Sequence, residues 1–109
     1  MAYDEKLAER VRTALMGLKG MSEKKMFGGL CFLLYGNMVC GVSKDRLMMR
    51  VGAARHDEAM RQKHAVPMDF TGKPMKGFIF IAPEGVRRAD SLAKWLKMGL
   101  DHAKTLPPK

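Results

Sequence analysis

The 109-residue sequence contains no hydrophobic run that could cross a bilayer. Its longest apolar segment extends only from Leu30 to Tyr35, whereas a membrane-spanning helix needs about 20 apolar residues. The first residues are polar and charged, without the apolar core that a secretory signal peptide requires. We therefore expect a cytoplasmic protein that does not associate with membranes.

Cysteine is also scarce, since Cys31 and Cys40 are the only two, too few for a disulfide framework. The Gly36-Asn37 pair predicts a two-residue hairpin turn between two apolar strands. In that register Leu33 lies opposite Cys40, and Cys31 becomes a diagonal neighbour of Cys40 on the same face, about 7 to 8 Å away. That separation is at or beyond the reach of an unstrained disulfide, so we expect two reduced, buried thiols.

The usual signatures of metal proteins and nucleotide enzymes are missing. None of the three histidines is spaced as a metal ligand, and there is no G-x-G-x-x-G loop or Walker lysine. A thiol enzyme could be assembled from Cys40, His64 and Asp69, or around Cys31, but no exposed elbow or oxyanion hole accompanies them. We expect no catalytic residue, metal or cofactor, and a small thiol-dependent enzyme stays only as a third alternative.

Acidic residues are few, 11 against 20 Lys and Arg, and the net charge is +9. Nine basic and five acidic residues fall in positions 1–52, and eleven and six in 53–109, so no basic arm or tail exists. A basic surface binds nucleic acid when its charges gather on one face. A nucleic-acid-associated domain is therefore the second hypothesis, and it requires such convergence of six residues. These residues are Arg46, Arg50, Lys73, Lys76, Arg87 and Arg88.

The apolar pattern predicts helices at the two ends of the chain and an antiparallel meander between them. Asp4 is expected to cap a first helix that ends near Leu18 before Gly20, and Asp90 a last helix extending to Ala103. Expected strands are 24–27, 30–35, 38–43, 46–51 and 78–81, with a helix-permissive segment at 53–63. The order α-β-β-β-β-α-β-α predicts one domain, residues 1–109, with a two-layer α+β fold and a mainly antiparallel sheet.

One expected strand, 30–35, is apolar on both faces, so both faces need cover from the chain or from a second copy of the protein. In the strand 46–51, Leu47 and Met49 point to one face and Met48 to the other. Methionine adapts to irregular partners. Because 11 methionines are present, we expect some to be exposed, with Met48 the preferred candidate.

Two further segments indicate a recognition surface. Gly28 and Gly29 permit a bend or a close backbone approach, and the proline- and glycine-rich segment 64–77 reads as a structured loop that either closes the sheet or flanks a contact surface. The predicted partner surface comprises Phe27, Gly28, Gly29, Met48, Asp69, Thr71, Gly72, Lys73, Lys76 and Gly77.

Several motifs, in order along nearly the whole chain, resemble the N-terminal domain of the TfoX/Sxy regulators of bacterial natural competence. They are Met26-Phe27-Gly28-Gly29, Cys40-Gly41-Val42, Leu47 to Val51, Pro67 to Gly77, and Leu106-Pro107-Pro108-Lys109. The resemblance implies a fold related to YjbR-like and secretion-chaperone-like domains. It also implies a protein without catalytic residues or cofactor, because none is established for the family. Full-length members resemble positive regulators that act alongside a transcription activator, and they carry a separate C-terminal helical domain.

The first hypothesis is therefore a non-enzymatic regulatory module that binds a protein. The transcription machinery is one candidate partner, and a homodimer through the doubly apolar sheet is another.

Overall fold

The computed structural model of the chain describes residues 3–26, 28–67 and 76–108. The helices are α1 (Glu5–Leu15), α2 (His56–Met60) and α3 (Ala89–Ala103), with short 3-10 turns η1 (Ala53–Arg55) and η2 (Pro83–Val86). The strands are β1 (Met21–Met26), β2 (Gly29–Leu34), β3 (Asn37–Ser43), β4 (Arg46–Arg50), β5 (Ala65–Pro67) and β6 (Phe78–Ile81). The predicted α+β class and element order are confirmed, apart from β5, which lies in a segment predicted to be a loop.

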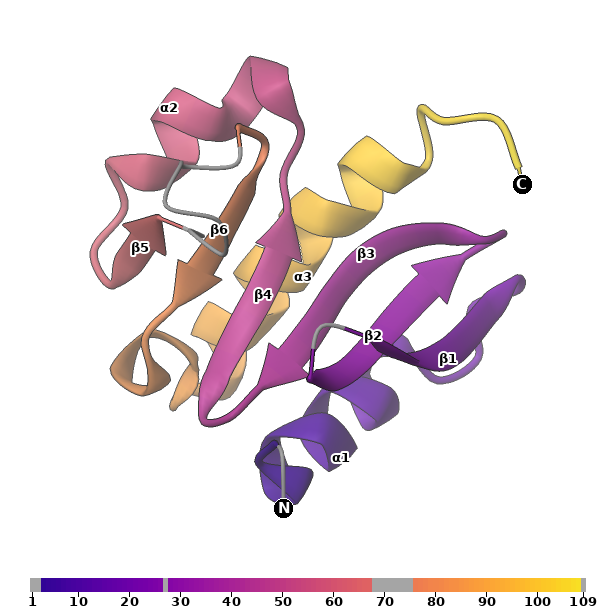
Figure 1. Cartoon of the computed structure of the whole chain (residues 1–109), viewed down its shortest axis with the longest axis horizontal. Coiled ribbons are helices and arrows are strands. Elements are labelled where there is room, and N and C mark those ends of the chain that lie inside the picture. The colour runs from indigo at the N-terminus through magenta and orange to yellow at the C-terminus, as the bar shows by residue number, and fades with distance from the viewer. Residues whose placement is uncertain (1–2, 27, 68–75, 109) are drawn as a thin grey trace.

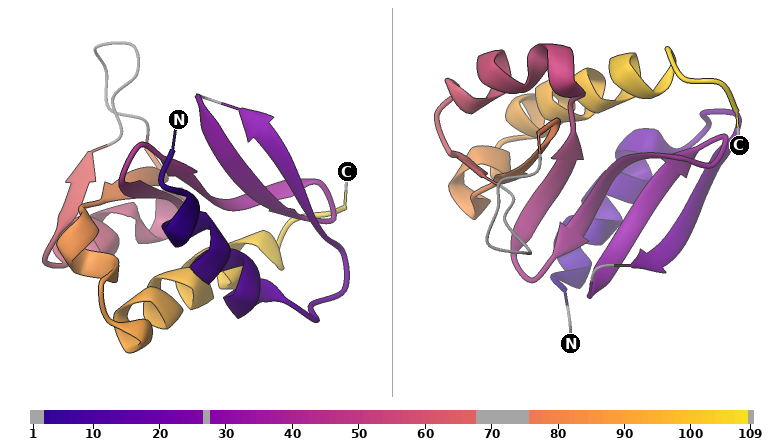
Figure 2. Two further views of the ribbon diagram at one scale, coloured as in Figure 1. Left: turned by 90° about the horizontal axis from the view of Figure 1, so that it is seen from below. Right: turned by 45° about the horizontal axis from the view of Figure 1, so that its top comes forward.

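The six strands form one sheet in the order β1-β2-β3-β4-β6-β5, and every neighbouring pair is antiparallel. Helices α1 and α3 cover the same face of this sheet, while α2 lies at its end beside β5 and β6 (Figures 1 and 2). The architecture is thus two layers, as expected. Among the described residues, none of the helices combines the length and apolar character needed to cross a membrane.

Helix α1 begins as predicted, because the Asp4 carboxylate accepts hydrogen bonds from the backbone N–H groups of Lys6 (2.9 Å) and Leu7 (3.2 Å). It ends earlier than predicted, at Leu15. Gly17 adopts a φ of 89° just after the helix, which stops the chain from continuing to Leu18.

Helix α3 begins at Ala89, one residue before the predicted cap Asp90. Its N-cap is Arg88, whose side chain makes no capping hydrogen bond. Asp90 is instead in the first turn, where its carboxylate accepts from the N–H of Ser91 and pairs with Arg88 at 3.1 Å. The prediction of Asp90 as the cap was therefore wrong, although an acid in the first turn still complements the helix dipole.

The hairpin between β2 and β3 differs from the predicted register. Its turn residues are Tyr35 and Gly36, both with positive φ, so Leu34 pairs with Asn37. A register shift follows between Phe32 and Leu33. The turn therefore lies one residue earlier than the Gly36-Asn37 turn expected from the sequence.

The shifted register changes the position of the two cysteines. Cys40 lies opposite Phe32 in the core beneath the helices, whereas Cys31 lies opposite Gly41 on the other face. Side chains alternate between faces, so a change of one residue moves a side chain across the sheet. Both thiols are free and buried, as predicted, but the prediction that they share a face was wrong.

The sheet carries an apolar cluster on each face. The larger cluster packs between the sheet and the two long helices and includes Val11, Met49 and Trp95. The smaller cluster on the opposite face contains Cys31, Met38, Met48 and Phe80, with Leu33 and Phe78 packed against it. The sequence therefore predicted correctly that β2 is apolar on both sides.

Met48 points away from the helices, as predicted, but it is buried rather than exposed. Its side chain is 0% exposed, and it packs in the smaller cluster beside Cys31 and Phe80. Gly41 leaves room for it, since a Cβ at that position would lie 2.6 Å from the Met48 terminal methyl. The expected exposure of Met48 was thus wrong, because the smaller cluster encloses it within the single chain.

Candidate functional site

The predicted partner surface is only partly within the described residues. Five of its members lie outside them: Phe27, Asp69, Thr71, Gly72 and Lys73. The other members are separated in the fold. Gly29 lies against Val42 and Ser43, next to the start of β4, whereas Gly77 bonds to Val51 after the end of β4. The structure therefore does not bring the described members into one surface.

Gly28 and Gly29 have distinct backbone roles. Gly28 is exposed, with a φ of 71° and open space where a Cβ would stand. Gly29 is buried, and a Cβ there would lie 2.0 Å from the carbonyl oxygen of Val42. One glycine thus supplies a turn conformation and the other a close backbone approach, the two uses that the sequence predicted for this pair.

Gly77 connects the start of β6 to the end of β4. Its carbonyl oxygen accepts the N–H groups of Val51 (2.9 Å) and Gly52 (3.2 Å), and its own N–H donates to His56 Nδ1 (2.9 Å). With a φ of 92°, this position suits glycine. Gly77 is therefore a structural connector, while the neighbouring Lys76 is exposed.

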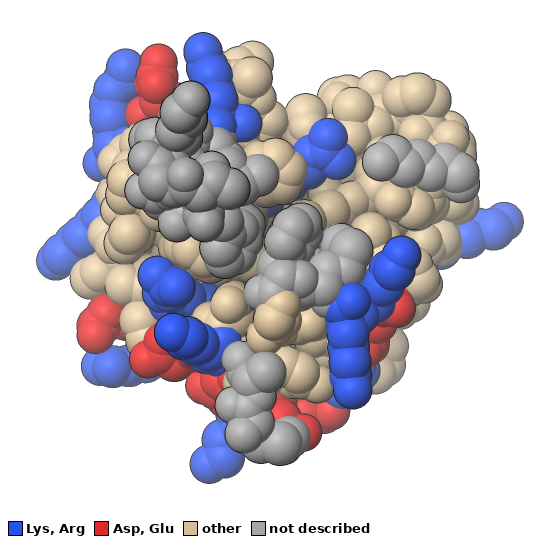
Figure 3. Space-filling model, viewed as in Figure 1, with Lys and Arg blue, Asp and Glu red and all other residues tan. Residues whose placement is uncertain are grey.

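The basic residues of the nucleic-acid hypothesis are divided between the two layers. Arg46 stacks over Phe80 at 3.9 Å and Arg50 over Phe78 at 5.7 Å, both beside the smaller cluster. Arg87 instead lines a hollow beside α1, and Arg88 pairs with Asp90 at the start of α3. Looking onto the smaller-cluster side, Lys and Arg form separate groups with acids among them (Figure 3). The convergence that this hypothesis requires is not found among the described residues.

The two thiols are poorly placed for nucleophilic chemistry. Cys31 and Cys40 are each 0% exposed. Burial raises the pKa of Cys31 to about 11, and burial likewise raises the pKa of Cys40. Because the thiolate is the nucleophile, neither group is activated. Within the described part of the chain, no cluster of three or more His, Cys, Asp or Glu residues could hold a metal ion.

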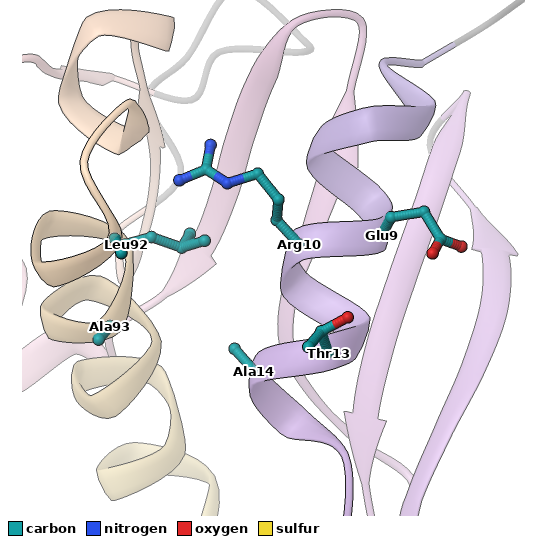
Figure 4. A pocket seen from close by; sticks show the side chains of 7 residues that line it. Glu9, Arg10, Thr13, Ala14, Leu92 and Ala93 are labelled. Carbon is teal, nitrogen blue, oxygen red and sulfur yellow. The ribbon is translucent and has the colours of Figure 1, made fainter.

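A trough between the helices is the site that sequence reasoning missed. A hollow of about 360 Å³ lies between α1 and the start of α3, where Ala14, Ala89 and Ala93 form small walls above the buried Leu92. Figure 4 shows Leu92 pointing towards α1 across this space. The alanines were only a weak indication of this groove in the sequence. Small residues on two helices leave a groove only if the helices are neighbours, and the sequence does not show that they are.

Arg10 divides the trough from a second hollow of about 280 Å³, which η2 and the start of α1 enclose. Its guanidinium reaches across from α1 and donates to the carbonyl oxygens of Val86 (2.7 Å) and Arg87 (3.2 Å) (Figure 4). Arg10 thereby ties α1 to the segment before α3. The two hollows together follow α1 for most of its length.

The fold and the trough define a two-layer α+β domain with an apolar groove between its long helices. The family model of the TfoX N-terminal domain matches residues 13–103, from within α1 to the last residue of α3. The chain therefore belongs to the TfoX N-terminal domain family. No curated protein and no solved structure gives a significant match.

Proposed function

We propose that this chain is a non-enzymatic regulatory module that binds a partner protein in the trough between α1 and α3. The observation that carries the proposal is an apolar groove of about 360 Å³ with small side chains on both walls. Membership of the TfoX N-terminal domain family supports a regulatory role, since this is not a known enzyme family. The burial of both thiols supports a role other than thiol catalysis.

The trough fits an amphipathic helix of the partner. Alanines on both walls, Ala14 from α1 and Ala93 from α3, allow a third helix to approach closely, and Leu92 offers an apolar floor. Peptide helices commonly dock into such grooves through an apolar stripe. The occupant we propose is thus a helical segment of a different protein, with its apolar residues on one side.

Charge favours a partner helix with acidic flanks. The chain carries a net charge of +9, and Lys6, Arg10 and Arg87 line the second hollow. Of the two acids there, Asp4 is engaged in capping α1, which leaves Asp45. A net positive field accelerates encounter with acidic partners and discriminates against basic ones. A regulatory protein of the transcription machinery is the partner class that the family suggests.

The second face of the sheet offers a homodimer less apolar surface than the sequence predicted. Cys31 and Met48 are 0% exposed and Phe80 only 3%. Burial of these side chains within one chain leaves little further area for a second copy to cover. A homodimer through this face is therefore a weaker proposal than docking in the trough.

A site-specific crosslinking experiment tests the trough. A photoreactive phenylalanine analogue replaces Ala93 in one protein and Ala54 of η1, which is also exposed, in another. In the native cytosol we expect the first position alone to crosslink to an amphipathic, acid-flanked helix, mapped by mass spectrometry. Ala14→Trp, which fills the trough, should abolish that crosslink, whereas Ala54→Trp should leave it intact.

Other outcomes would overturn this proposal. Crosslinks between two copies of the purified chain at position 93 would assign the trough to self-association. Equal labelling at positions 54 and 93, or a crosslink that survives Ala14→Trp, would remove the trough as the docking surface. Circular dichroism of each variant shows that its fold is kept.

A further inference from the structure

A third hollow, of about 300 Å³, lies on the other side of α3 from the trough. One side of it is formed by the turn between α2 and β5, including Lys63 and His64. The other side is formed by Lys94 and Trp95 of α3 and by its N-cap residue Arg88. The trough uses Ala89, Leu92 and Ala93 of the same helix. The two sites therefore occupy different faces of α3 and can be tested independently.

Three cationic side chains line this hollow, which we name the α3 pocket: Lys63, Arg88 and Lys94. Among the described residues that line it, Glu84 is the one acid. Lys94 is held there by a hydrogen bond of 2.9 Å from its Nζ to Gln62 Oε1, which joins the two sides. The lining is thus basic and offers several hydrogen-bond donors.

The pocket also lies at the N-terminal end of a long helix. Helix α3 has 15 residues, and its N-cap residue Arg88 provides no side-chain cap. Ser91, in the first turn, lines the pocket as well. Backbone N–H groups at a helix N-terminus favour negative charge. The Asp90 carboxylate already accepts from the N–H of Ser91 and pairs with Arg88, so it is the other N–H groups of the first turn that add to the field of the cations.

Trp95 gives an independent indication that a ligand belongs in the pocket. Its side chain is only 4% exposed, and no described residue is seen to accept a hydrogen bond from its indole N–H. In the described part of the chain, no fully buried side-chain nitrogen or oxygen is without a partner. The indole nitrogen therefore keeps a small exposure, and Trp95 is one of the residues that line the α3 pocket. Buried tryptophan N–H groups usually find an acceptor.

We propose that the α3 pocket binds the phosphate group of a small phosphorylated metabolite. Lys63 and Lys94 supply most of the charge, because Asp90 offsets part of the charge of Arg88 at 3.1 Å, while Ser91 and the indole N–H of Trp95 supply neutral donors. Phosphate suits this set because it has several acceptor oxygens and carries close to two negative charges near neutral pH. A hollow of about 300 Å³ is at the lower end of small-molecule pockets, which favours a compact metabolite over a polymer.

The chain carries its own reporter for this test, because Trp95 is the only tryptophan. Ribose 5-phosphate is titrated at constant ionic strength and followed by Trp95 fluorescence and by calorimetry, with ribose as the uncharged control. We expect saturable binding of ribose 5-phosphate and of inorganic phosphate, and no response to ribose. Malonate, a dicarboxylate, should bind at least tenfold more weakly if phosphate is preferred.

Lysine variants locate the binding. Lys94→Gln and Lys63→Gln should each weaken ribose 5-phosphate binding by about 10 to 100-fold, because each removes a charge-assisted hydrogen bond. Lys97→Gln is the matched control, since Lys97 is on the same helix, is 77% exposed and pairs with Asp101 instead of lining the pocket. It removes the same charge and should leave the affinity within twofold.

Three outcomes would overturn the proposal. Absence of saturable binding would remove the site, and equal weakening by Lys97→Gln and Lys94→Gln would show only diffuse attraction of anions. An oligonucleotide that binds tightly while ribose 5-phosphate neither binds nor competes would assign the cations to nucleic acid. Thermal unfolding of the three variants, all at exposed positions, shows that folding is unchanged.

Discussion

Met48 and Met49 are neighbours on β4 and are both 0% exposed, yet they lie on opposite faces of the sheet. Met49 reaches α3, where its terminal methyl would lie 2.6 Å from a Cβ placed on Gly99. Met48 lies over Gly41 in the smaller cluster. The same residue type is therefore buried in two ways, beneath a helix on one face and among sulfur and aromatic side chains on the other.

The difference shows how a two-layer fold can protect a sheet face that none of the described helices covers. Arg46 and Arg50 lay their guanidinium groups over Phe80 and Phe78, while both remain partly exposed. Long cationic side chains can cover apolar surface while their charged ends stay in water. These two flexible side chains thus cover part of the face away from the helices, and we expect this face to tolerate change better than the helix-covered face.

Truncation of the two methionines should reveal this difference most strongly. Met49→Ala is expected to cost about 4 kcal/mol of unfolding free energy and Met48→Ala about 2 kcal/mol, within the range for buried methionine. The cavity beneath α3 is enclosed, whereas the cavity near Arg46 can be filled by side-chain movement. Urea unfolding measures both values. Equal costs, or a larger cost for Met48→Ala, would contradict the proposed difference between the faces.

Each methionine contacts one glycine: Met49 contacts Gly99 and Met48 contacts Gly41. Replacing these glycines with alanine should give the next largest effect on stability. Gly99→Ala is expected to cost about 2 to 3 kcal/mol and Gly41→Ala about 1 to 2 kcal/mol, as for overpacked sites. A Cβ at Gly99 meets the carbonyl oxygen of Val39 at 2.8 Å, which cannot move without the backbone. At Gly41 the closest backbone atom is farther away, the carbonyl oxygen of Leu30 at 3.1 Å. Thermal unfolding compares the two; a more destabilising Gly41→Ala would show that the second face is as rigid as the first.

The stacked arginines should contribute less. Arg46→Gln is expected to lower stability by about 1 kcal/mol and Arg50→Gln by under about 0.5 kcal/mol, since cation–π energy falls with distance. Arg46 lies 3.9 Å from the Phe80 ring centre and Arg50 5.7 Å from that of Phe78. The double variants with Phe80→Leu and Phe78→Leu separate stacking from charge. No coupling between Arg46 and Phe80 would remove the arginines as cover for this face.

The smallest expected effect is electrostatic and links the two layers. Burial, and secondarily the charge of Arg50, lowers the pKa of His102 on α3. The unfolded chain therefore binds this proton more readily. Stability should be greatest above the unfolded pKa of about 6.5 and should fall as pH drops towards the lower folded pKa.

Two variants check the assignment to His102. His102→Gln should remove this part of the pH dependence, and Arg50→Gln should move the His102 pKa back towards its ordinary value, as measured by NMR titration. An unchanged His102 titration in Arg50→Gln would show that the two layers are electrically independent at this position.

Local patterns in the sequence predicted most elements, and failures occurred where the competing choices differ by one residue. The cap at Asp4 and the strands 38–43 and 78–81 were correct or nearly so. The β2–β3 turn was placed one residue late, because Tyr35 adopts positive φ and a bulge then shifts the register. Strand β5 was missed because it is only three residues long and ends in proline. Its pairing with β6 depends on a contact distant in sequence.

The candidate site was less predictable than the fold. Gly29 allows a close backbone approach and Gly77 connects β6 to the end of β4. The partner surface predicted around these two glycines is not continuous. The trough depends on the spacing between α1 and α3, and the α3 pocket on the turn between α2 and β5 meeting α3. Neither spacing is encoded in any local run of residues.

The amino-acid sequence was enough to predict most helices and strands of the two layers, the apolar character of β2 on both sides, the reduced thiols and the family to which the chain belongs. These properties depend on local periodicity, turn chemistry and residue identity. Tertiary structure alone decided which face each cysteine occupies, that Met48 is buried, and where the hollows lie. Those outcomes depend on register and on how distant segments pack, because a shift of one residue reverses a strand's faces and a cavity exists only between elements already in contact.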